Sequence, residues 1–211
     1  MADISTEGIN VPALQKTMEL YCALMTEIKY RIDGMNAIAH AGLPVRISYE
    51  ACYLQLRLIC ESIAIGCLVV NGDILTSKSS KLAKTWEADR LIYRLSEIHP
   101  AFYPEPVEPD GGNRHKLAKV SAPVLSKDEL IALYRRCGGK LHRGALKDLH
   151  RSFESPNLSF VQIQASRDKI VHLLQHHWIS VFNSSDKIGV QMGGPNAAPT
   201  WSYWRAVGTE P

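Results

Sequence analysis

The sequence predicts a mainly α-helical protein, a bundle of about five helices with a long Pro/Gly-rich insertion and a C-terminal β-hairpin. Apolar residues recur with helical spacing over most of the chain. Prolines and glycines gather at about 100–125, and apolar residues alternate with polar ones near the C-terminus. Because 211 residues suffice for one core and no linker is apparent, we expect one domain, with the helical bundle over 1–185 and the hairpin over 186–211 packed on it.

The first predicted helix begins near Pro12 and ends near Ala41, where the sequence turns to Gly and Pro. Its apolar residues follow alternating steps of four and three, as the seams of helical bundles do: Leu14, Met18, Tyr21, Met25, Ile28, Ile32 and Met35. The repeat is short, so we favour a seam inside one chain over a coiled coil between two chains.

The second predicted helix, 48–70, is apolar nearly all the way round, which is typical of a central helix enclosed by its neighbours. Its uncharged run is too short to span a bilayer, so we expect no membrane partner. Arg57 and Glu61 stand four residues apart on one face of this helix. Charges in such a helix are tolerated only when paired, so we expect both to be mostly buried and to contact each other or a shared partner.

Three more helices are expected before the hairpin. One spans about 78–98, with Trp86 among its inward-facing residues, and the last spans about 160–182. Between them, Ser126 and Glu129 have the spacing of a capping box and start a helix that Gly138 and Gly139 can bend or end. The segment 100–125 should form two extended arms about a turn.

The predicted hairpin follows the last helix. Ile188, Val190 and Met192 alternate with small or polar residues, and after a Gly-Gly-Pro-Asn turn the alternation resumes. We expect Trp201 and Tyr203 to pack on the bundle or on a second subunit. Together with Trp204 and Arg205 they also form an aromatic and cationic group of the kind that stacks bases of single-stranded nucleic acid.

The composition says more about the cellular compartment of the protein than about its binding partner. The net charge of +3 is too small to indicate a nucleic acid or a membrane by itself. The five cysteines are odd in number and mostly lie within apolar helical patterns, which argues against a disulfide scaffold and for a reducing compartment. The first ten residues have neither a basic leader nor an apolar run, so we expect a cytoplasmic protein.

Cofactor and metal sites are not expected. The sequence has no phosphate-binding glycine loop, nucleophile elbow or dinucleotide fingerprint, so we predict no cofactor. Asp168, His172 and His176 recur every four residues on the last predicted helix and are candidates for metal ligands. A zinc site needs further convergent ligands that the sequence does not offer, so we favour a hydrated polar face and no metal.

The segment 134–144 carries the one candidate for chemistry. Arg136 is followed, after five intervening residues, by His142, late in a small helical bundle. This motif resembles that of the HEPN superfamily (higher eukaryotes and prokaryotes nucleotide-binding), and the resemblance covers the short motif and the overall helical architecture. It implies a metal-independent ribonuclease of a defence or toxin system, acting on RNA as a homodimer whose two motifs meet at the interface.

The resemblance gives His142 the acid–base role and Arg136 the phosphate-stabilising role, and Glu61 on the central helix is a candidate to orient one of them. An imidazole titrates near neutral pH and a guanidinium presents a planar fork to phosphate, so the chemistry is sound. Residues seven apart realign on an unbroken helix, which makes Arg135 an alternative to Arg136. Cys137 departs from the family, in whose active members this position is usually polar.

A second hypothesis remains open beside the RNA-acting one. The chain would then be a non-catalytic interaction module that homodimerises, with the first helix and the hairpin building a protein interface. The exposure of His142 in a basic groove, as opposed to its burial as a packing residue, distinguishes the two.

Overall fold

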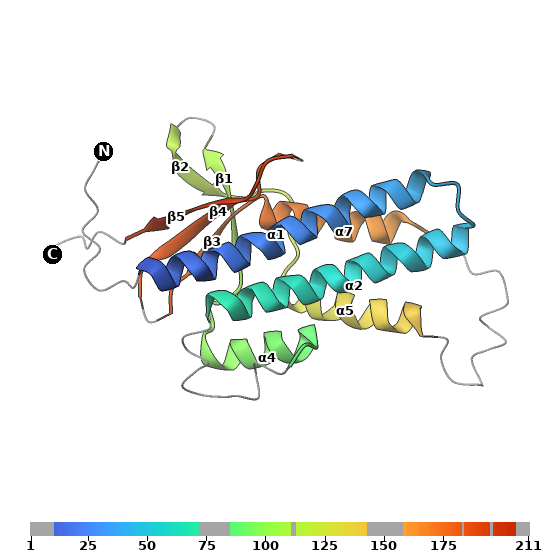
Figure 1. Cartoon of the computed structure of the whole chain (residues 1–211), viewed down its shortest axis with the longest axis horizontal. Helices are drawn as coiled ribbons and strands as arrows, with labels where there is room; N and C mark the ends of the chain where they lie inside the picture. Colours follow the sequence, from blue (N-terminus) through green and yellow to red (C-terminus); the bar gives the residue numbers. More distant parts are fainter. Residues whose placement is uncertain are drawn as a thin grey trace.

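The computed structural model describes residues 11–71, 85–110, 113–142, 158–182, 184–194 and 196–205. Within these residues the fold is mainly α, as predicted, with five helices and one antiparallel sheet of five strands. The helices run along the long axis of the molecule, and the strands gather beside the N-terminal half of the first helix (Figure 1). The helices are α1 (Val11–His40), α2 (Val45–Val70), α4 (Ala88–Ile98), α5 (Lys127–Leu141) and α7 (Val161–Leu174). The strands are β1 (Glu105–Asp110), β2 (Asn113–Lys119), β3 (His176–Ser180), β4 (Lys187–Gln191) and β5 (Thr200–Trp204).

The predicted seam holds α1 against α2. A short turn joins the two helices, and Gly42 in it has φ of 65°, a left-handed conformation that glycine adopts at no steric cost. Five seam residues are buried and Leu14 and Ile32 are partly buried against the same core. On the α2 side, Gly66 permits close approach, because a Cβ there would lie 3.1 Å from the Tyr21 ring. The prediction that the α1 seam packs inside the chain is confirmed.

The central position of α2 is also confirmed. It packs against α1, α4, α5 and α7, and it buries twelve residues. Among the described helices, α2 is the one long and apolar enough to cross a membrane by length and composition. Half of its most apolar stretch is buried inside the fold, as in the core helix of a bundle.

Two helix boundaries differ from the prediction. Helix α4 begins at Ala88, so Trp86 precedes it and is 59% exposed, which makes the inward-facing assignment of Trp86 wrong; residues 78–84 lie outside the described part. Helix α7 ends at Leu174 and the predicted continuation to 182 is wrong. The aromatic and β-branched residues that follow pair with two strands, which satisfies the backbone groups a helix would otherwise satisfy.

The start of α5 agrees with the prediction and its glycines do not interrupt it. The Glu129 amide donates to Ser126 Oγ at 3.2 Å, and the Ser126 amide donates to the Glu129 carboxylate at 2.9 Å, which is a capping box. The helix continues through Gly138 and Gly139 to Leu141. The sequence is also compatible with a helical segment that resumes over 141–149, and most of these residues lie outside the described part.

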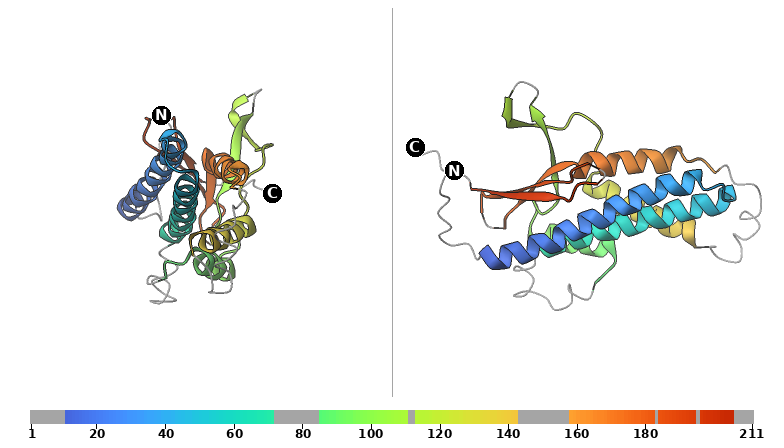
Figure 2. Two further views of the ribbon diagram at one scale, coloured as in Figure 1. Left: turned by 90° about the vertical axis from the view of Figure 1, so that its right-hand side faces the viewer. Right: turned by 45° about the horizontal axis from the view of Figure 1, so that its top comes forward.

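The sheet has the strand order β2-β1-β3-β4-β5. The predicted C-terminal hairpin is β4 and β5, and the two extended arms of the 100–125 insertion are β1 and β2, so both are confirmed. Strand β3 joins them into one sheet, and the β1–β2 hairpin projects beyond its other strands (Figure 2). One face of the sheet packs on the helices, with Ile179, Ile188 and Val190 buried and Trp201 and Tyr203 packed against the same core, as predicted for these two.

A buried histidine joins this face of the sheet to α1. The Tyr21 hydroxyl donates to His177 Nε2 at 2.7 Å, and His177 Nδ1 donates to the Leu174 carbonyl at 3.0 Å. Burial lowers the pKa of His177 to about 4, although the bond to Leu174 opposes this change. The imidazole is therefore neutral at pH 7, which fits its one donated and one accepted hydrogen bond.

Candidate functional site

The C-terminal half of α5 presents the two motif residues to solvent. Arg136 and His142 are both exposed, and His142 is the first residue beyond the helix, with its amide donating to the Gly138 carbonyl at 3.0 Å. Two residues that are six apart on an α-helix differ by about 9 Å in height and point about 120° apart around the helix axis. The two groups therefore lie at different heights and on different sides of this helix end within one copy of the chain.

Arg135 is engaged by another helix. Its Nε lies 3.1 Å from Asp89 Oδ2 of α4, and the Asp89 side chain is only 22% exposed. This ion pair links α5 to α4. The Arg135 side chain is itself 69% exposed, so this is a surface ion pair that competes only weakly with a phosphate for the guanidinium.

Glu61 and Arg57 form the contact predicted from their spacing. Arg57 Nε lies 3.3 Å from Glu61 Oε1, and the two side chains are 21% and 18% exposed. Arg57 also donates to the Tyr134 hydroxyl at 2.7 Å, and its guanidinium carbon lies 4.3 Å from the centroid of that ring. A Cβ at Gly138 would lie 3.1 Å from Arg57 Nη1. Glu61 is thus connected to α5 through its contacts with Arg57 and Tyr134. No contact among the described residues joins Glu61 to His142.

Two exposed cations follow each other by one turn of α5 on the side that faces α2. Lys140 Nζ lies 5.9 Å from the centroid of the Tyr49 ring. Arg136 is close enough to Tyr53 to oppose the rise in the pKa of its phenol that burial causes. Arg136 and Lys140 are both exposed, and neither has an ion-pair partner among the described residues. Lys140 was not singled out from the sequence, although its position four residues after Arg136 places it on the same side of α5.

The departure at Cys137 has a structural explanation. This thiol is buried beside α2, and burial raises the pKa of Cys137 to about 12 although Arg57 and Arg136 oppose the rise. It stays protonated at neutral pH and packs as a small apolar group. Its apolar character is therefore required by the core.

The row Asp168, His172 and His176 is not formed, because α7 ends before His176 and that residue stands on β3. His172 Nδ1 lies 2.9 Å from the Pro123 carbonyl and Asp168 pairs with Arg167. In the described part of the chain, no three His, Cys, Asp or Glu side chains are grouped to hold a metal ion.

Comparisons of the chain with protein-family models, with curated proteins and with solved structures found no match. The HEPN resemblance thus stays one of a short motif and a helical architecture. The C-terminal half of α5 carries two exposed cations, Arg136 and Lys140, and the exposed imidazole of His142 follows the helix.

Proposed function

We propose that this chain binds RNA on the C-terminal half of α5 and cleaves it there without a metal ion. The observation that carries the proposal is the exposure, at one end of one helix, of two cations without a described carboxylate partner and of an imidazole. Arg136 and Lys140 hold a phosphate, and His142 transfers protons. The proposal keeps the roles that the HEPN resemblance implies and adds Lys140.

The chemistry needs imidazole and guanidinium groups, and each copy of the chain presents both kinds on this surface. His142 as neutral imidazole takes the proton of a ribose 2′-hydroxyl, and the 2′-oxygen attacks the adjacent phosphorus. The bond from phosphorus to the 5′-oxygen breaks, and an imidazolium returns a proton to that oxygen. The products are a 2′,3′-cyclic phosphate and a 5′-hydroxyl. The Arg136 guanidinium stabilises the charge that develops on the phosphoryl oxygens.

A homodimer supplies what one copy lacks. In a single chain Arg136 and His142 stand about 9 Å apart along the α5 axis, and one imidazole cannot be base and acid at the same moment. Two α5 ends brought together place a second imidazole and a second guanidinium beside the same phosphate. The proposal therefore requires activity to depend on self-association.

The test incubates purified protein with mixed RNA in a chelator and compares it with His142→Ala and Arg136→Ala. Each replacement should lower the cleavage rate about 100-fold or more. His40→Ala is the matched control, because His40 is also an exposed histidine at the end of a helix. DNA of the same base composition should stay intact, since it lacks the attacking hydroxyl. Equal cleavage by wild type and His142→Ala, or no cleavage by any protein at high concentration, overturns the ribonuclease proposal.

A non-catalytic interaction module is the second candidate, favoured by exposed apolar side chains on the two longest helices. Leu20 and Tyr30 of α1 are 54% and 69% exposed, and Leu54 of α2 is 43% exposed. Self-association that persists in His142→Ala and weakens in Leu20→Ser, with no RNA cleavage by wild type, would favour this function.

A further inference from the structure

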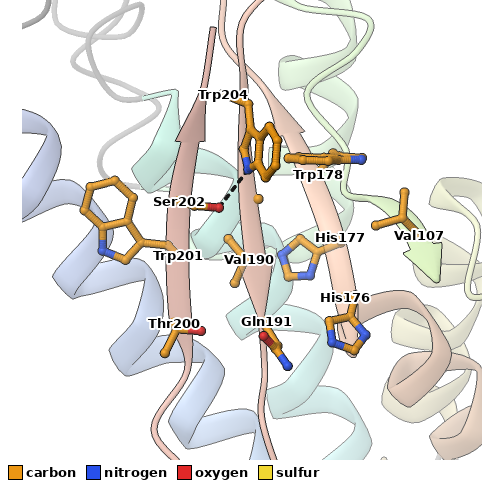
Figure 3. A pocket seen from close by; sticks show the side chains of 11 residues that line it. Val107, His176, His177, Trp178, Val190, Gln191, Thr200, Trp201, Ser202 and Trp204 are labelled. Carbon is orange, nitrogen blue, oxygen red and sulfur yellow. Dashed lines mark hydrogen bonds between the residues drawn. The ribbon is translucent and has the colours of Figure 1, made fainter. Parts of the chain in front are cut away.

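The sheet has an outer face, turned away from the core, that carries an aromatic groove of about 230 Å³ (Figure 3). The register of three neighbouring strands places the residues that line this groove. Trp178, Gly189 and Ser202 stand opposite one another on β3, β4 and β5, and His176, Gln191 and Thr200 form the next row. Trp204, two residues after Ser202, points to the same face and is 53% exposed.

Gly189 makes room for the groove. A Cβ at this position would lie 2.8 Å from Trp178 Cζ3 and 3.2 Å from Trp204 Nε1. A side chain at this position would therefore force the Trp178 ring to shift and would crowd the Trp204 ring. Their centroids lie 5.4 Å apart with the ring planes at 87°, and Figure 3 shows Trp204 face-on beside Trp178 edge-on. Trp204 Nε1 donates to Ser202 Oγ at 2.8 Å, so the ring is held in place before any ligand arrives.

The groove has the chemistry of a site for one flat polar ring. Its volume is below the roughly 300 Å³ at which pockets for drug-sized ligands begin. An indole offers a π-face for stacking, and the rim carries an amide at Gln191 and a hydroxyl at Thr200, which together donate and accept hydrogen bonds. A nucleobase has both a face that stacks and an edge of donors and acceptors.

Charge beside the groove favours a base that carries a phosphate backbone. Val107 of β1 lines the groove, and the exposed Lys119 of β2 stands opposite Val107 in the ladder, on the same face. The other flanking lysine, Lys187, is paired with Glu105 at 2.7 Å. Lys119, Lys187 and Glu105 together therefore give the groove rim a net positive charge.

We propose that the groove beside the Trp178–Trp204 pair stacks an unpaired base of single-stranded RNA. The inference rests on the proposed function for the identity of the polymer, but it uses side chains on a different face of the molecule. It gives the protein a preference for single strands, because bases inside a duplex are already stacked on their neighbours.

The test measures binding of a short single-stranded 2′-O-methyl oligonucleotide, which lacks the attacking hydroxyl and so cannot be cleaved by the proposed route. Trp204→Ala should weaken binding about tenfold or more, Trp204→Phe should weaken it less, and Gly189→Val should weaken it by filling the groove. Trp86→Ala is the matched control, because Trp86 is an indole of similar exposure, 59% against 53%. An oligonucleotide without bases should bind wild type and Trp204→Ala equally.

Two further measurements separate this inference from the proposed function. Quenching of tryptophan emission by the oligonucleotide should persist in an Arg136→Ala/Lys140→Ala protein and be lost in a Trp178→Phe/Trp204→Phe protein. RNA cleavage abolished by His142→Ala, with binding by Trp204→Ala equal to that of Trp86→Ala, overturns the groove and leaves the ribonuclease. Binding that depends on Trp204, with cleavage equal in wild type and His142→Ala, leaves the groove and overturns the ribonuclease.

Discussion

Acid should unfold this protein in part through His177. The imidazole is fully buried and neutral, and burial lowers its pKa from an ordinary 6.5 to about 4. The unfolded chain takes up a proton at this site once the pH falls below about 6.5, whereas the folded chain does not until about pH 4. Between these values the unfolded state binds more protons, so the free energy of unfolding decreases as the pH falls.

The size of the effect follows from the two pKa values. Each pH unit within that window costs about 1.4 kcal/mol, so the loss from this one residue approaches about 3 kcal/mol near pH 4 and then levels off. A loss of this size is a large part of the 5 to 15 kcal/mol that is typical of folded domains. Above about pH 6.5 the contribution of His177 is independent of pH.

Urea denaturation followed by circular dichroism at pH 7, 5.5 and 4 measures this loss. His177→Gln keeps a neutral donor and acceptor in place of the imidazole, so it lowers stability at every pH but removes the part that titrates. The difference between the two proteins should shrink as the pH falls. His40→Gln, which replaces an exposed histidine, should retain the acid loss of wild type. Equal losses of unfolding free energy in wild type and His177→Gln between pH 6.5 and 4 would refute the assignment.

Three further predictions concern the helices and are read as free energies of unfolding in urea. Ile28→Ala should cost about 2 to 5 kcal/mol, because Ile28 is fully buried in the α1 seam; a loss below 1 kcal/mol would contradict tight packing there. Ser126→Ala should cost about 1 kcal/mol through loss of the α5 cap, and Ser126→Asp should retain most of the stability. Glu61→Gln should cost about 1 kcal/mol, and less in an Arg57→Met background, because the pair is partly exposed; equal costs in both backgrounds would show no coupling.

The elements that the sequence predicts well are those whose signal is local. The α1 seam shows in the spacing of apolar residues along one stretch of chain, and the α5 cap shows in one tetrapeptide. Both could therefore be predicted without knowing which elements pack beside them. The Arg57–Glu61 contact belongs to the same class, since four residues is the spacing of one helical turn. In each case the pattern lies within one short stretch of the chain.

The end of α7 shows where local signals fail. Ile170, Leu174, Trp178 and Val181 have the three- and four-residue spacing of a helical face, and they also fit a short aromatic and β-branched strand. Pairing with β4 and β1 decides between the two, and both partners are distant in sequence. The sequence analysis named Trp204 as a base-stacking residue but could not find Trp178 and Gly189 beside it, because the groove depends on the register of three strands.

The choice between Arg135 and Arg136 as the motif arginine also depends on contacts with residues that are distant in sequence. Helical spacing alone favours Arg135, because it stands seven residues before His142 and α5 is unbroken through its glycines. The fold then brings Asp89 of α4 within 3.1 Å of Arg135 and engages its charge. Arg136, which is less well aligned, has no such carboxylate among the described residues and is joined by Lys140 one turn later. The Arg135 side chain is 69% exposed, so this surface ion pair contributes about 1 kcal/mol or less and disfavours Arg135 as a phosphate ligand only modestly. We expect this ion pair to favour Arg136 as the phosphate ligand. An Asp89→Asn substitution should then make Arg135 compete for the same phosphate, which would appear as RNA binding that Arg136→Ala weakens less than it does in the protein with Asp89.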